Sequence, residues 1–462
     1  MWSVVPTRRH VLGALAALGT VTTACSRSGS TAVAPTTSAG AARPTHSIVT
    51  RWAADPWSLG SYSALPVGAT PDDRALLARP FGPIHVAGEA TSTDAPATVH
   101  GAVASGLRAA AEVAATVPAG GRVVVVGAGA AGLATAATLA PSHSVVVLEA
   151  RNRPFGRVQT DRSTGTPVEL GAAWIHGSTG NPLVGLADEA GVATVPFDWD
   201  DSRIVDPDGQ VDPTEAEAAF SDVLSELESR ADATGISVEE VVRSGTAALD
   251  LDQPTARGVD RLVASEIEGE SALPARELSV GGWNEGATLV GGDLLVVGGY
   301  DRILEPLTVG VEIRTEAPVD RISWDERTPG AVVGTLGGQE SADAVVLTVP
   351  VAVLQSGRPR LEGPVPDTWT AALRRIGTGT LDKVVLAFGG DRDAPSPPTL
   401  VTGWWGPVRG RFATWIDLGR ATGAPIVVAT SAGDAATEQE SLDDRTLVDE
   451  ATAVLSRITA TD

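Results

Sequence analysis

One stretch of the chain, residues 122–149, limits the possible folds more than any other. Residues 122–126 form an apolar, β-branched run that is typical of a buried parallel strand, and Gly-Ala-Gly-Ala-Ala-Gly follows directly at residues 127–132. An alanine-rich helical stretch comes next, and a second apolar run, residues 144–148, ends at Glu149. This pattern predicts a strand–helix–strand unit that holds the diphosphate of a dinucleotide at the start of its helix.

The residues of this loop have separate tasks. Gly127 permits the tight turn, Gly129 lets backbone N–H groups approach the diphosphate, and Gly132 lets the helix and the strand pack closely. Ala131, in the same loop, is a further candidate contact of the cofactor. Glu149 can accept hydrogen bonds from ribose hydroxyls, which disfavours a 2′-phosphate and therefore NADP. The unit does not by itself separate FAD from NAD.

Length and charge limit the class of protein. A chain of 462 residues can hold two or three domains. Its net charge of -23 argues against nucleic-acid binding, which needs a basic face. The negative charge is concentrated in residues 198–285, where 22 Asp or Glu residues stand against 6 Arg. This stretch is either a solvated helical surface or a domain whose field gathers polycations, and the sequence leaves both interpretations open.

The N-terminus predicts export. Thr7-Arg8-Arg9 is similar to a twin-arginine signal, and the apolar run of residues 11–21 is shorter than the roughly 20 residues that span a bilayer. Residues 1–25 are therefore expected to be a signal peptide and residues 26–44 a flexible tether. Cys25 is a candidate for lipidation, which would anchor the protein to the outer face of a membrane. A chance cysteine beside an ordinary cleavage site is the alternative, and the protein would then be secreted.

Residues beyond the dinucleotide unit indicate a family. Glu149-Ala150-Arg151 followed by Gly156-Arg157 resembles the EAR…GGR stretch of flavin amine oxidases, whose arginine meets the FAD phosphates, with Phe155 in place of the first glycine. Residues 169–182, ELGAAWIHGSTGNP, resemble the polyamine and spermine oxidase branch. The resemblance implies an FAD-dependent amine oxidase. It implies that the residues of these two stretches contact FAD or the substrate: Glu149, Ala150, Arg151, Arg157, Ala173 and Trp174 for FAD, and Trp174 and His176 for the substrate.

Three further segments resemble FAD-binding parts of the same family. Residues 86–91 are similar to its second FAD-binding turn, and residues 317–322 to the return into its FAD domain. Residues 98–102 open a helix that the resemblance aims at the flavin pyrimidine, where its N-terminal dipole favours negative charge. The FAD contacts implied here are Gly88, Glu89, Val99 and Val319.

The order of these segments differs from the order in the family. Residues 51–116 resemble the family's closing part, yet they precede the dinucleotide loop, and the sequence stops at Asp462, where the family would begin that part. The resemblance therefore implies a circular permutation with residues 117–122 as the new bridge. An error in the assembly of the gene is the alternative.

Two residues are candidates for the chemistry. Lys383 is the only lysine in the chain and resembles the family lysine that reaches flavin N5 through a water; Arg could not replace it, being larger, planar and permanently charged. The resemblance puts Tyr62, one of two tyrosines, against the substrate amine. Ser61 occupies the position of the flavin-linking cysteine of monoamine oxidases, so FAD is expected to be non-covalent. Whether Trp404, Trp405 and Trp415 wall the pocket or the core stays open.

The resemblance implies an α/β fold, with a doubly wound, Rossmann-like FAD-binding domain and a second, mixed α+β substrate domain. The FAD-binding domain is expected in residues 45–178, which hold the permuted segment 45–116 and the unit 122–178, and again in residues 291–355. The substrate domain is expected in residues 179–290, mainly helical, and in residues 356–462, which form a sheet and a closing helix.

The implied reaction oxidises a small-molecule amine, polyamines in particular, to an aldehyde and a shorter amine, with molecular oxygen as acceptor and release of hydrogen peroxide. Two alternatives stay open: a related flavin oxidase of another substrate such as an L-amino acid, and a non-catalytic surface protein that retains FAD. The sequence shows no metal-ligand cluster, and contact with a membrane is expected only through a lipid on Cys25.

Overall fold

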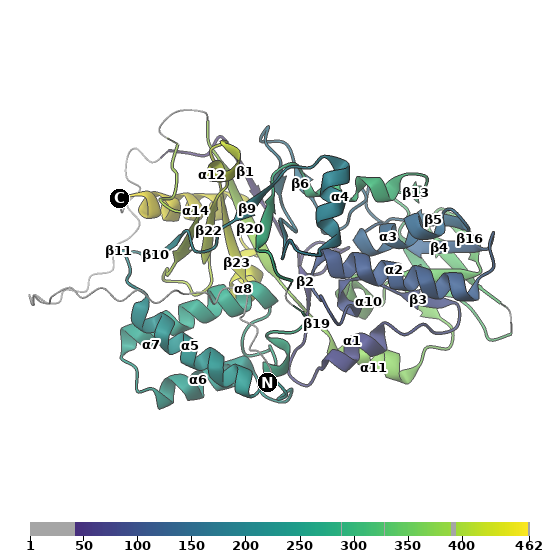
Figure 1. The fold of residues 1–462 in the computed structure, drawn as a ribbon, viewed down its shortest axis with the longest axis horizontal. Coiled ribbons are helices and arrows are strands. Elements are labelled where there is room, and N and C mark those ends of the chain that lie inside the picture. Colours follow the sequence, from purple (N-terminus) through teal and green to yellow (C-terminus); the bar gives the residue numbers. More distant parts are fainter. Residues whose placement is uncertain (1–41, 288, 328, 390–393, 461–462) are drawn as a thin grey trace, which may run out of the picture.

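The structure is a computed structural model that describes residues 42–287, 289–327, 329–389 and 394–460 (Figure 1). The predicted signal peptide with Cys25, and nearly all of the predicted tether, lie outside these residues. Figure 1 shows two domains side by side, one built on a parallel sheet and the other on a larger sheet with a helical layer below it. Within the described residues, no helix is both long and apolar enough to cross a membrane.

The first domain is built on a parallel five-stranded sheet, which confirms the predicted Rossmann-like fold. Its order is β13–β5–β4–β17–β3, and every neighbouring pair is parallel. Valines of β4 alternate between two apolar clusters, because successive side chains of a strand point to opposite faces. The strands are β3 (Ile84–Val86), β4 (Arg122–Val126), β5 (Ser144–Leu148), β13 (Glu312–Arg314) and β17 (Ala344–Leu347).

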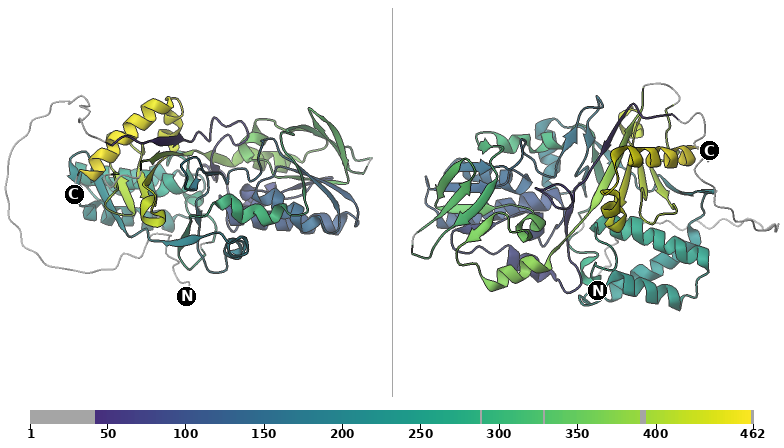
Figure 2. Two further views of the ribbon diagram at one scale, coloured as in Figure 1. Left: turned by 90° about the horizontal axis from the view of Figure 1, so that it is seen from above. Right: turned by 180° about the vertical axis from the view of Figure 1, so that it is seen from behind.

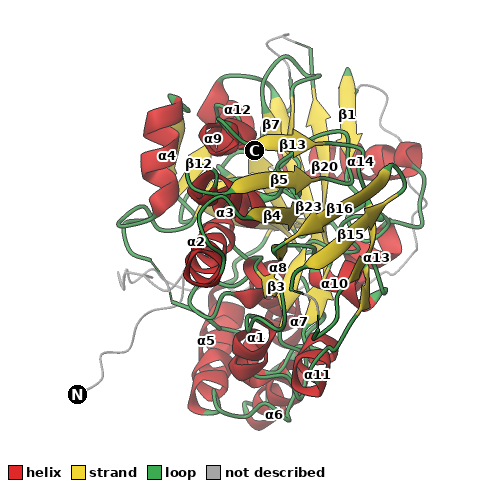
Figure 3. Cartoon of the chain, turned by 90° about the vertical axis from the view of Figure 1, so that its right-hand side faces the viewer, coloured by secondary structure: helices red, strands yellow, loops and turns green. Residues whose placement is uncertain are grey.

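The two faces of this sheet are covered differently (Figure 3). Helices α2 (Val99–Thr116) and α3 (Ala130–Leu139) cover one face. A four-stranded sheet and two helices cover the other face. These are β14 (Val319–Ser323), β15 (Ala331–Thr335), β16 (Gly338–Ala342), β18 (Arg360–Glu362), α10 (Val351–Gln355) and α11 (Asp367–Arg375).

Part of the N-terminal segment, residues 45–116, completes this domain. It supplies the edge strand β3, which pairs with β17, and the helix α2, which packs along α3. Helix α2 begins at Thr98, whose side chain accepts a hydrogen bond from the N–H of Gly101 at 3.0 Å. The helices approach so closely that a Cβ atom at Gly106 would lie 2.2 Å from the carbonyl oxygen of Ala131. Segments on both sides of residues 117–121 therefore form one layer.

The second domain contains a seven-stranded sheet in the order β1–β20–β23–β22–β21–β10–β11. Helix α14 (Asp444–Thr459) crosses one face, as the view from behind in Figure 2 shows. Trp404 and Trp415 are buried in the core between this helix and the sheet, which answers the question that the sequence left open. The strands are β1 (His46–Val49), β10 (Ser202–Asp206), β11 (Gly209–Gln210), β20 (Leu381–Ala387), β21 (Val401–Trp404), β22 (Thr414–Asp417) and β23 (Ile426–Ala432).

Strand β1 differs from the expectation for the N-terminal segment. Residues 45–116 were expected as a whole in the FAD-binding domain, yet β1 pairs antiparallel with β20, with Ile48 opposite Val385. The reason is burial: the side chains of β20 are covered on both faces, so its open edge is a favourable place for a further apolar strand.

Helices of the second domain form its lower layer around one apolar cluster. Trp405 packs against this cluster and thus belongs to the core as well. A single π-helical turn, Val263–Ile267, separates α7 from α8. The helices are α5 (Thr214–Ser229), α6 (Val238–Ala248), α7 (Gln253–Leu262) and α8 (Glu268–Ser271).

Short elements connect these layers. The strands are β2 (Tyr62–Ala64), β6 (Thr160–Asp161), β7 (Val168–Glu169), β8 (Trp174–Ile175), β9 (Thr194–Phe197), β12 (Asp293–Val296) and β19 (Gly377–Gly379). The helices are α1 (Pro71–Leu77), α4 (Pro182–Ala190), α9 (Tyr300–Leu304), α12 (Leu418–Thr422) and α13 (Gly433–Gln439). Strands β8, β12 and β9 form a small antiparallel sheet, and β2 pairs with β19.

The contact between α2 and α3 predicts opposite effects for one substitution in two helices. Gly106→Ala should lower the free energy of unfolding by about 1–3 kcal/mol, because the added methyl group collides with the backbone of α3. Gly185→Ala in α4 is the matched control: its Cβ atom meets open space, so stability should rise by up to ~1 kcal/mol. Urea unfolding followed by circular dichroism measures both, and equal stabilisation of the two variants would contradict the packing.

Candidate functional site

A cavity of about 510 Å³ lies where the two domains meet, at the carboxyl ends of β4 and β5. Every predicted cofactor, substrate and catalytic residue except Gly132 lines it. These are Tyr62, Gly88, Glu89, Val99, Gly127, Gly129, Ala131, Glu149, Ala150, Arg151, Arg157, Ala173, Trp174, His176, Val319 and Lys383. The fold thus brings residues from both sides of residues 117–121 into one site.

The glycine loop has the shape that a diphosphate needs. Gly127 has φ +106°, and a Cβ atom there would lie 2.7 Å from Thr348 Oγ1. Gly132 lies behind the cavity wall: its Cβ atom would lie 2.0 Å from the carbonyl oxygen of Gly127, so its task is packing. Gly129 caps α3 without a side-chain hydrogen bond, and it lines the cavity together with Ala130. The first N–H groups of α3 can therefore receive a phosphate.

Glu149 is fixed at the end of β5. Its carboxylate accepts hydrogen bonds from the N–H of Ala128 at 2.7 Å and from the N–H of Arg151 at 2.9 Å. A carboxylate has about four lone-pair sites, so oxygen lone pairs remain for ribose hydroxyls. Together with the loop and the apolar lining, this acid fits the adenosine diphosphate part of FAD.

Arg151 is engaged within the protein. Its guanidinium donates to both carboxylate oxygens of Asp55, at 2.9 and 2.7 Å, and to Ser58 Oγ at 2.8 Å. The resemblance implied a contact with FAD, and the residue does line the cavity, but its charge is balanced by Asp55. Arg151 therefore also holds residues 55–58 against the dinucleotide unit.

Arg157 and Glu89 form an ion pair on the cavity wall. Arg157 Nη1 lies 3.1 Å from Glu89 Oε1 and donates to the carbonyl oxygen of Ser61 at 2.8 Å. Burial alone would raise the pKa of Glu89, but the charges of Arg157 and Arg74 and a hydrogen bond from Ser63 lower it below its usual value. Glu89 is thus a buried carboxylate that stays ionised and orients Arg157.

Phe155, which stands where the family has a glycine, has a left-handed backbone. Its φ is +76° and that of Gly156 is +56°, both in the left-handed region, and its N–H donates to the carbonyl oxygen of Ala128 at 2.7 Å. Such a φ is rare for a bulky residue, and the ring packs between two apolar clusters, which helps to hold it. The turn before Arg157 is therefore made by two consecutive left-handed residues.

Lys383 is buried on β20 and reaches into the cavity. Nζ donates to the carbonyl oxygens of Glu169 at 2.9 Å and Gly171 at 2.7 Å, and it lies 5.6 Å from the ring centroid of Trp174. An ammonium has three N–H donors, so one is left for a ligand or a water. Burial lowers the pKa of Lys383 to about 8, which makes its neutral form accessible near neutral pH.

Tyr62 lies on β2 and lines the same cavity as Lys383. Its hydroxyl donates to the carbonyl oxygen of Gly269 at 2.9 Å. Ser61 Oγ donates to the carbonyl oxygen of Leu381 and accepts from the N–H of that residue, at 2.9 and 2.8 Å. Ser61 therefore clamps residues 61–62 to the first residue of β20, and it carries no sulfur that could bond to a flavin.

The wall that carries Trp174 and His176 is aromatic and polar. Trp174 packs against Trp199 and Phe197 with ring centroids 5.5 Å away in each case. His176 Nδ1 lies 3.1 Å from Asp293 Oδ2. The sequence analysis did not select Trp199 or Asp293, because the spacing along the chain contains no sign that they meet His176. Thr98 lines the cavity, whereas His100 is buried outside its lining.

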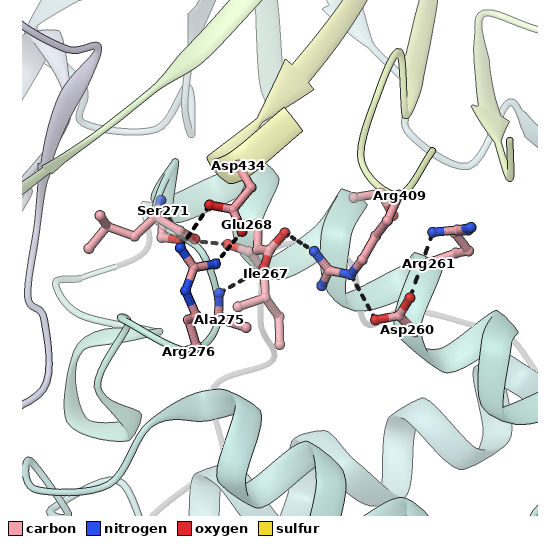
Figure 4. Close-up of polar contacts among 12 residues, drawn as sticks. Asp260, Arg261, Ile267, Glu268, Ser271, Ala275, Arg276, Arg409 and Asp434 are labelled. Carbon is pink, nitrogen blue, oxygen red and sulfur yellow. Dashed lines mark hydrogen bonds and ion pairs between the residues drawn. The ribbon is translucent and has the colours of Figure 1, made fainter. Parts of the chain in front are cut away.

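The π-helical turn and α8 bring Glu266 and Glu270 into the lining. Figure 4 shows how this region is held: Arg409 donates to Asp260 at 2.7 Å and to Glu268 at 2.5 Å, and Arg276 pairs with Asp434. Sequence reasoning did not select either cavity acid, but both belong to the acid-rich stretch of residues 198–285. With Glu285, three acids of that stretch line the cavity, and Glu266 lies on the π-helical turn, a feature that often occurs at functional sites.

Comparisons with known proteins agree with this geometry. The family of flavin-containing amine oxidoreductases matches residues 30–114 and 130–462. Probable polyamine oxidase 4 of Arabidopsis thaliana is 31% identical over 343 residues, which cover 70% of this chain and 68% of the relative. Lysine-specific histone demethylase 2 of Homo sapiens is 28% identical, over 73% of this chain and 43% of the relative.

Among solved structures, a putrescine oxidase bound to putrescine has a TM-score of 0.55 at 21% identity, over 73% of this chain and 81% of the other. A putative protoporphyrinogen oxidase from Exiguobacterium has a TM-score of 0.53 at 19% identity, over 74% and 83%. These two similarities concern the fold. Because the family match covers most of the chain, the chain belongs to the flavin-containing amine oxidoreductases and is an enzyme that uses FAD to oxidise amines.

Proposed function

We propose that this amine oxidase acts on polyamines and releases hydrogen peroxide. The observation that carries the proposal is the lining of a single cavity, which combines Lys383 and Tyr62 with two acids, Glu266 and Glu270. A polyamine has at least two nitrogens, and carboxylates bind cationic nitrogens. Relatives named polyamine oxidase and the putrescine oxidase structure support the same substrate class.

The residues of the site have distinct tasks in this proposal. FAD, held by the N-terminus of α3 and by Arg157, would supply the hydride acceptor for the carbon beside the amine and the route of the electrons to oxygen. The reacting nitrogen must be neutral, and exclusion of water by the apolar side chains of the lining disfavours a charge there. Tyr62 confines the amine, and Lys383 holds a water with its third N–H. Arg157 and the N-terminus of α3 bind the cofactor.

An amine panel tests the substrate class. Purified enzyme is offered spermine, spermidine, putrescine, a monoamine and L-amino acids, and hydrogen peroxide is measured. Polyamines should react fastest; turnover of L-amino acids alone would favour the alternative oxidase, and no turnover at all would favour a binding protein.

Since Ser61 offers no thiol, we also propose that FAD is bound non-covalently. Acid precipitation of the protein should therefore leave the yellow colour of the flavin in the supernatant.

Lys383→Met tests the role of the buried lysine. The variant should retain FAD, because the candidate phosphate contacts lie on α3 and Arg157. Reaction of the reduced enzyme with oxygen should slow by at least ~10-fold, equivalent to about 1.4 kcal/mol of barrier. Stopped-flow reoxidation measures this step. Wild-type reoxidation together with unaltered amine turnover would show that the lysine is structural.

We propose that the protein is exported by the twin-arginine route to the cell envelope and anchored by a lipid on Cys25. Thr7-Arg8-Arg9, the short apolar run and the lone cysteine support this. Arg8→Lys with Arg9→Lys should retain the protein in the cytoplasm, as cell fractionation would show. Cys25→Ala should release it from membranes, and unchanged membrane association of this variant would exclude lipidation.

We also propose that the chain is a circular permutation of its family. The two stretches that match the family are separated at residues 115–129, which include the expected bridge. Helix α14 packs against β1, so the two ends of the described fold lie close together. A chain opened at residues 118–121, with Thr459 joined to Thr45 by a short linker, should fold and bind FAD. Failure of this rearranged chain to bind FAD would count against the permutation.

A further inference from the structure

A partly buried hydrogen-bond cluster supports His176 at the cavity wall. Strands β8 and β12 are antiparallel, with Leu294 opposite Ile175, so Asp293 at the start of β12 lies beside His176. Asp293 Oδ2 lies 3.1 Å from His176 Nδ1, and Oδ1 accepts the N–H of Gly177 at 3.0 Å. The register of this small sheet therefore puts a carboxylate against one nitrogen of the imidazole.

Trp199 adds a second donor to the same carboxylate. Its Nε1 donates to Asp293 Oδ2 at 3.1 Å. Its ring packs 4.5 Å from Phe197 and 5.5 Å from Trp174, and Trp174 in turn faces Lys383 Nζ. Asp293 is thus held by three donors in an aromatic cluster that continues to the candidate catalytic lysine.

The ionisation of Asp293 determines the tautomer of His176. Burial raises its pKa, but hydrogen bonds from His176, Gly177 and Trp199, together with the charge of His176, lower it to about 2. An ionised carboxylate only accepts, so Nδ1 of His176 carries the proton, and in the neutral ring Nε2 is an acceptor. The ring lines the cavity, and no partner of Nε2 occurs among the residues that the structure describes.

We infer that Asp293 and Trp199 are positioning residues, which present His176 Nε2 to the nitrogen of the substrate as a proton acceptor. This inference rests on the proposed amine oxidation. In the step, an N–H bond of the substrate ammonium breaks, an Nε2–H bond forms, and the positive charge passes to the imidazole, where the Asp293 carboxylate stabilises it. The substrate nitrogen is left neutral, as hydride loss from its carbon requires.

Asp293→Asn removes this charge at nearly constant shape. Flavin reduction by substrate should slow by at least ~10-fold, which is part of the ~10²–10⁴-fold that general base catalysis contributes. FAD content and reoxidation by oxygen should stay at wild-type values. The matched control is Asp301→Asn, which removes a carboxylate that is paired with Arg162 at 2.7 Å and lies outside the cavity lining. The flavin of this variant should be reduced by substrate at the wild-type rate.

A double-mutant cycle separates positioning from general structure. His176→Gln combined with Asp293→Asn should be no slower than His176→Gln alone, because Asp293 acts through the imidazole. Additive losses would overturn the inference. Trp199→Phe, which keeps the ring, should slow reduction less than Asp293→Asn; if Asp293→Asn does not fold, a wild-type reduction rate for Trp199→Phe overturns the inference instead.

The tautomer can be measured without turnover. Nitrogen-15 NMR of the imidazoles should show His176 protonated on Nδ1 in the wild type, and a mixture of both tautomers in Asp293→Asn. A wild-type ring protonated on Nε2 would overturn the inference. If the wild type shows the expected tautomer but oxidises no amine, the proposed function fails while the placement of the proton stands.

Discussion

The ammonium group of Lys383 is buried at the junction of the two domains, and much of the surrounding structure keeps it there. Removing an ammonium from water is costly, and no described carboxylate lies within ion-pair distance of Nζ. Two carbonyl oxygens, from Glu169 and Gly171, accept two of its protons, and burial lowers its pKa to about 8. These carbonyls belong to the last residue of β7 and to the segment between β7 and β8, so the lysine ties the substrate sheet to the wall that carries Trp174.

The strand that holds Lys383 also seats the N-terminal segment. Asp382 points to the other side of β20, as alternation requires, and its Oδ1 accepts from Thr50 Oγ1 at 2.8 Å and from the N–H of Trp52 at 3.1 Å. Ser61 completes the contact through Leu381. Residues 50–62 thus run along the edge of the cavity, and Tyr62 is positioned by the same strand that positions the lysine, more than 300 residues later in the chain.

Local patterns explain which parts of the fold could be predicted. Strands β4 and β5 have the expected bounds, because β-branched runs between glycines or turns identify buried strands without information from elsewhere. Helix α3 begins at Ala130, earlier than the alanine-rich stretch suggested, because Gly132 lies inside its first turn. Of the site residues selected by motif resemblance, all but Gly132 lie in the cavity lining.

Other parts depend on register between distant segments, which no local pattern contains. Strand β1 joins the substrate sheet because its residues meet the edge of β20. Asp293 reaches His176 because Leu294 is opposite Ile175, and a shift of one residue would turn this carboxylate to the other face. In the π-helical turn that presents Glu266, each backbone hydrogen bond spans one residue more than in an α-helix. Composition does not reveal this change.

The charges of the cavity impose opposite demands on a bound amine. Of the acids of residues 198–285, Glu266, Glu270 and Glu285 line the cavity, and Glu285 is paired with the buried guanidinium of Arg74. Their field attracts a cation, and low-dielectric walls strengthen it. The same field opposes loss of a proton from a nearby nitrogen, whereas oxidation needs a neutral one. A ligand with two separated nitrogens meets both demands, because one can stay charged beside the glutamates while the other gives its proton to the imidazole that Asp293 supports.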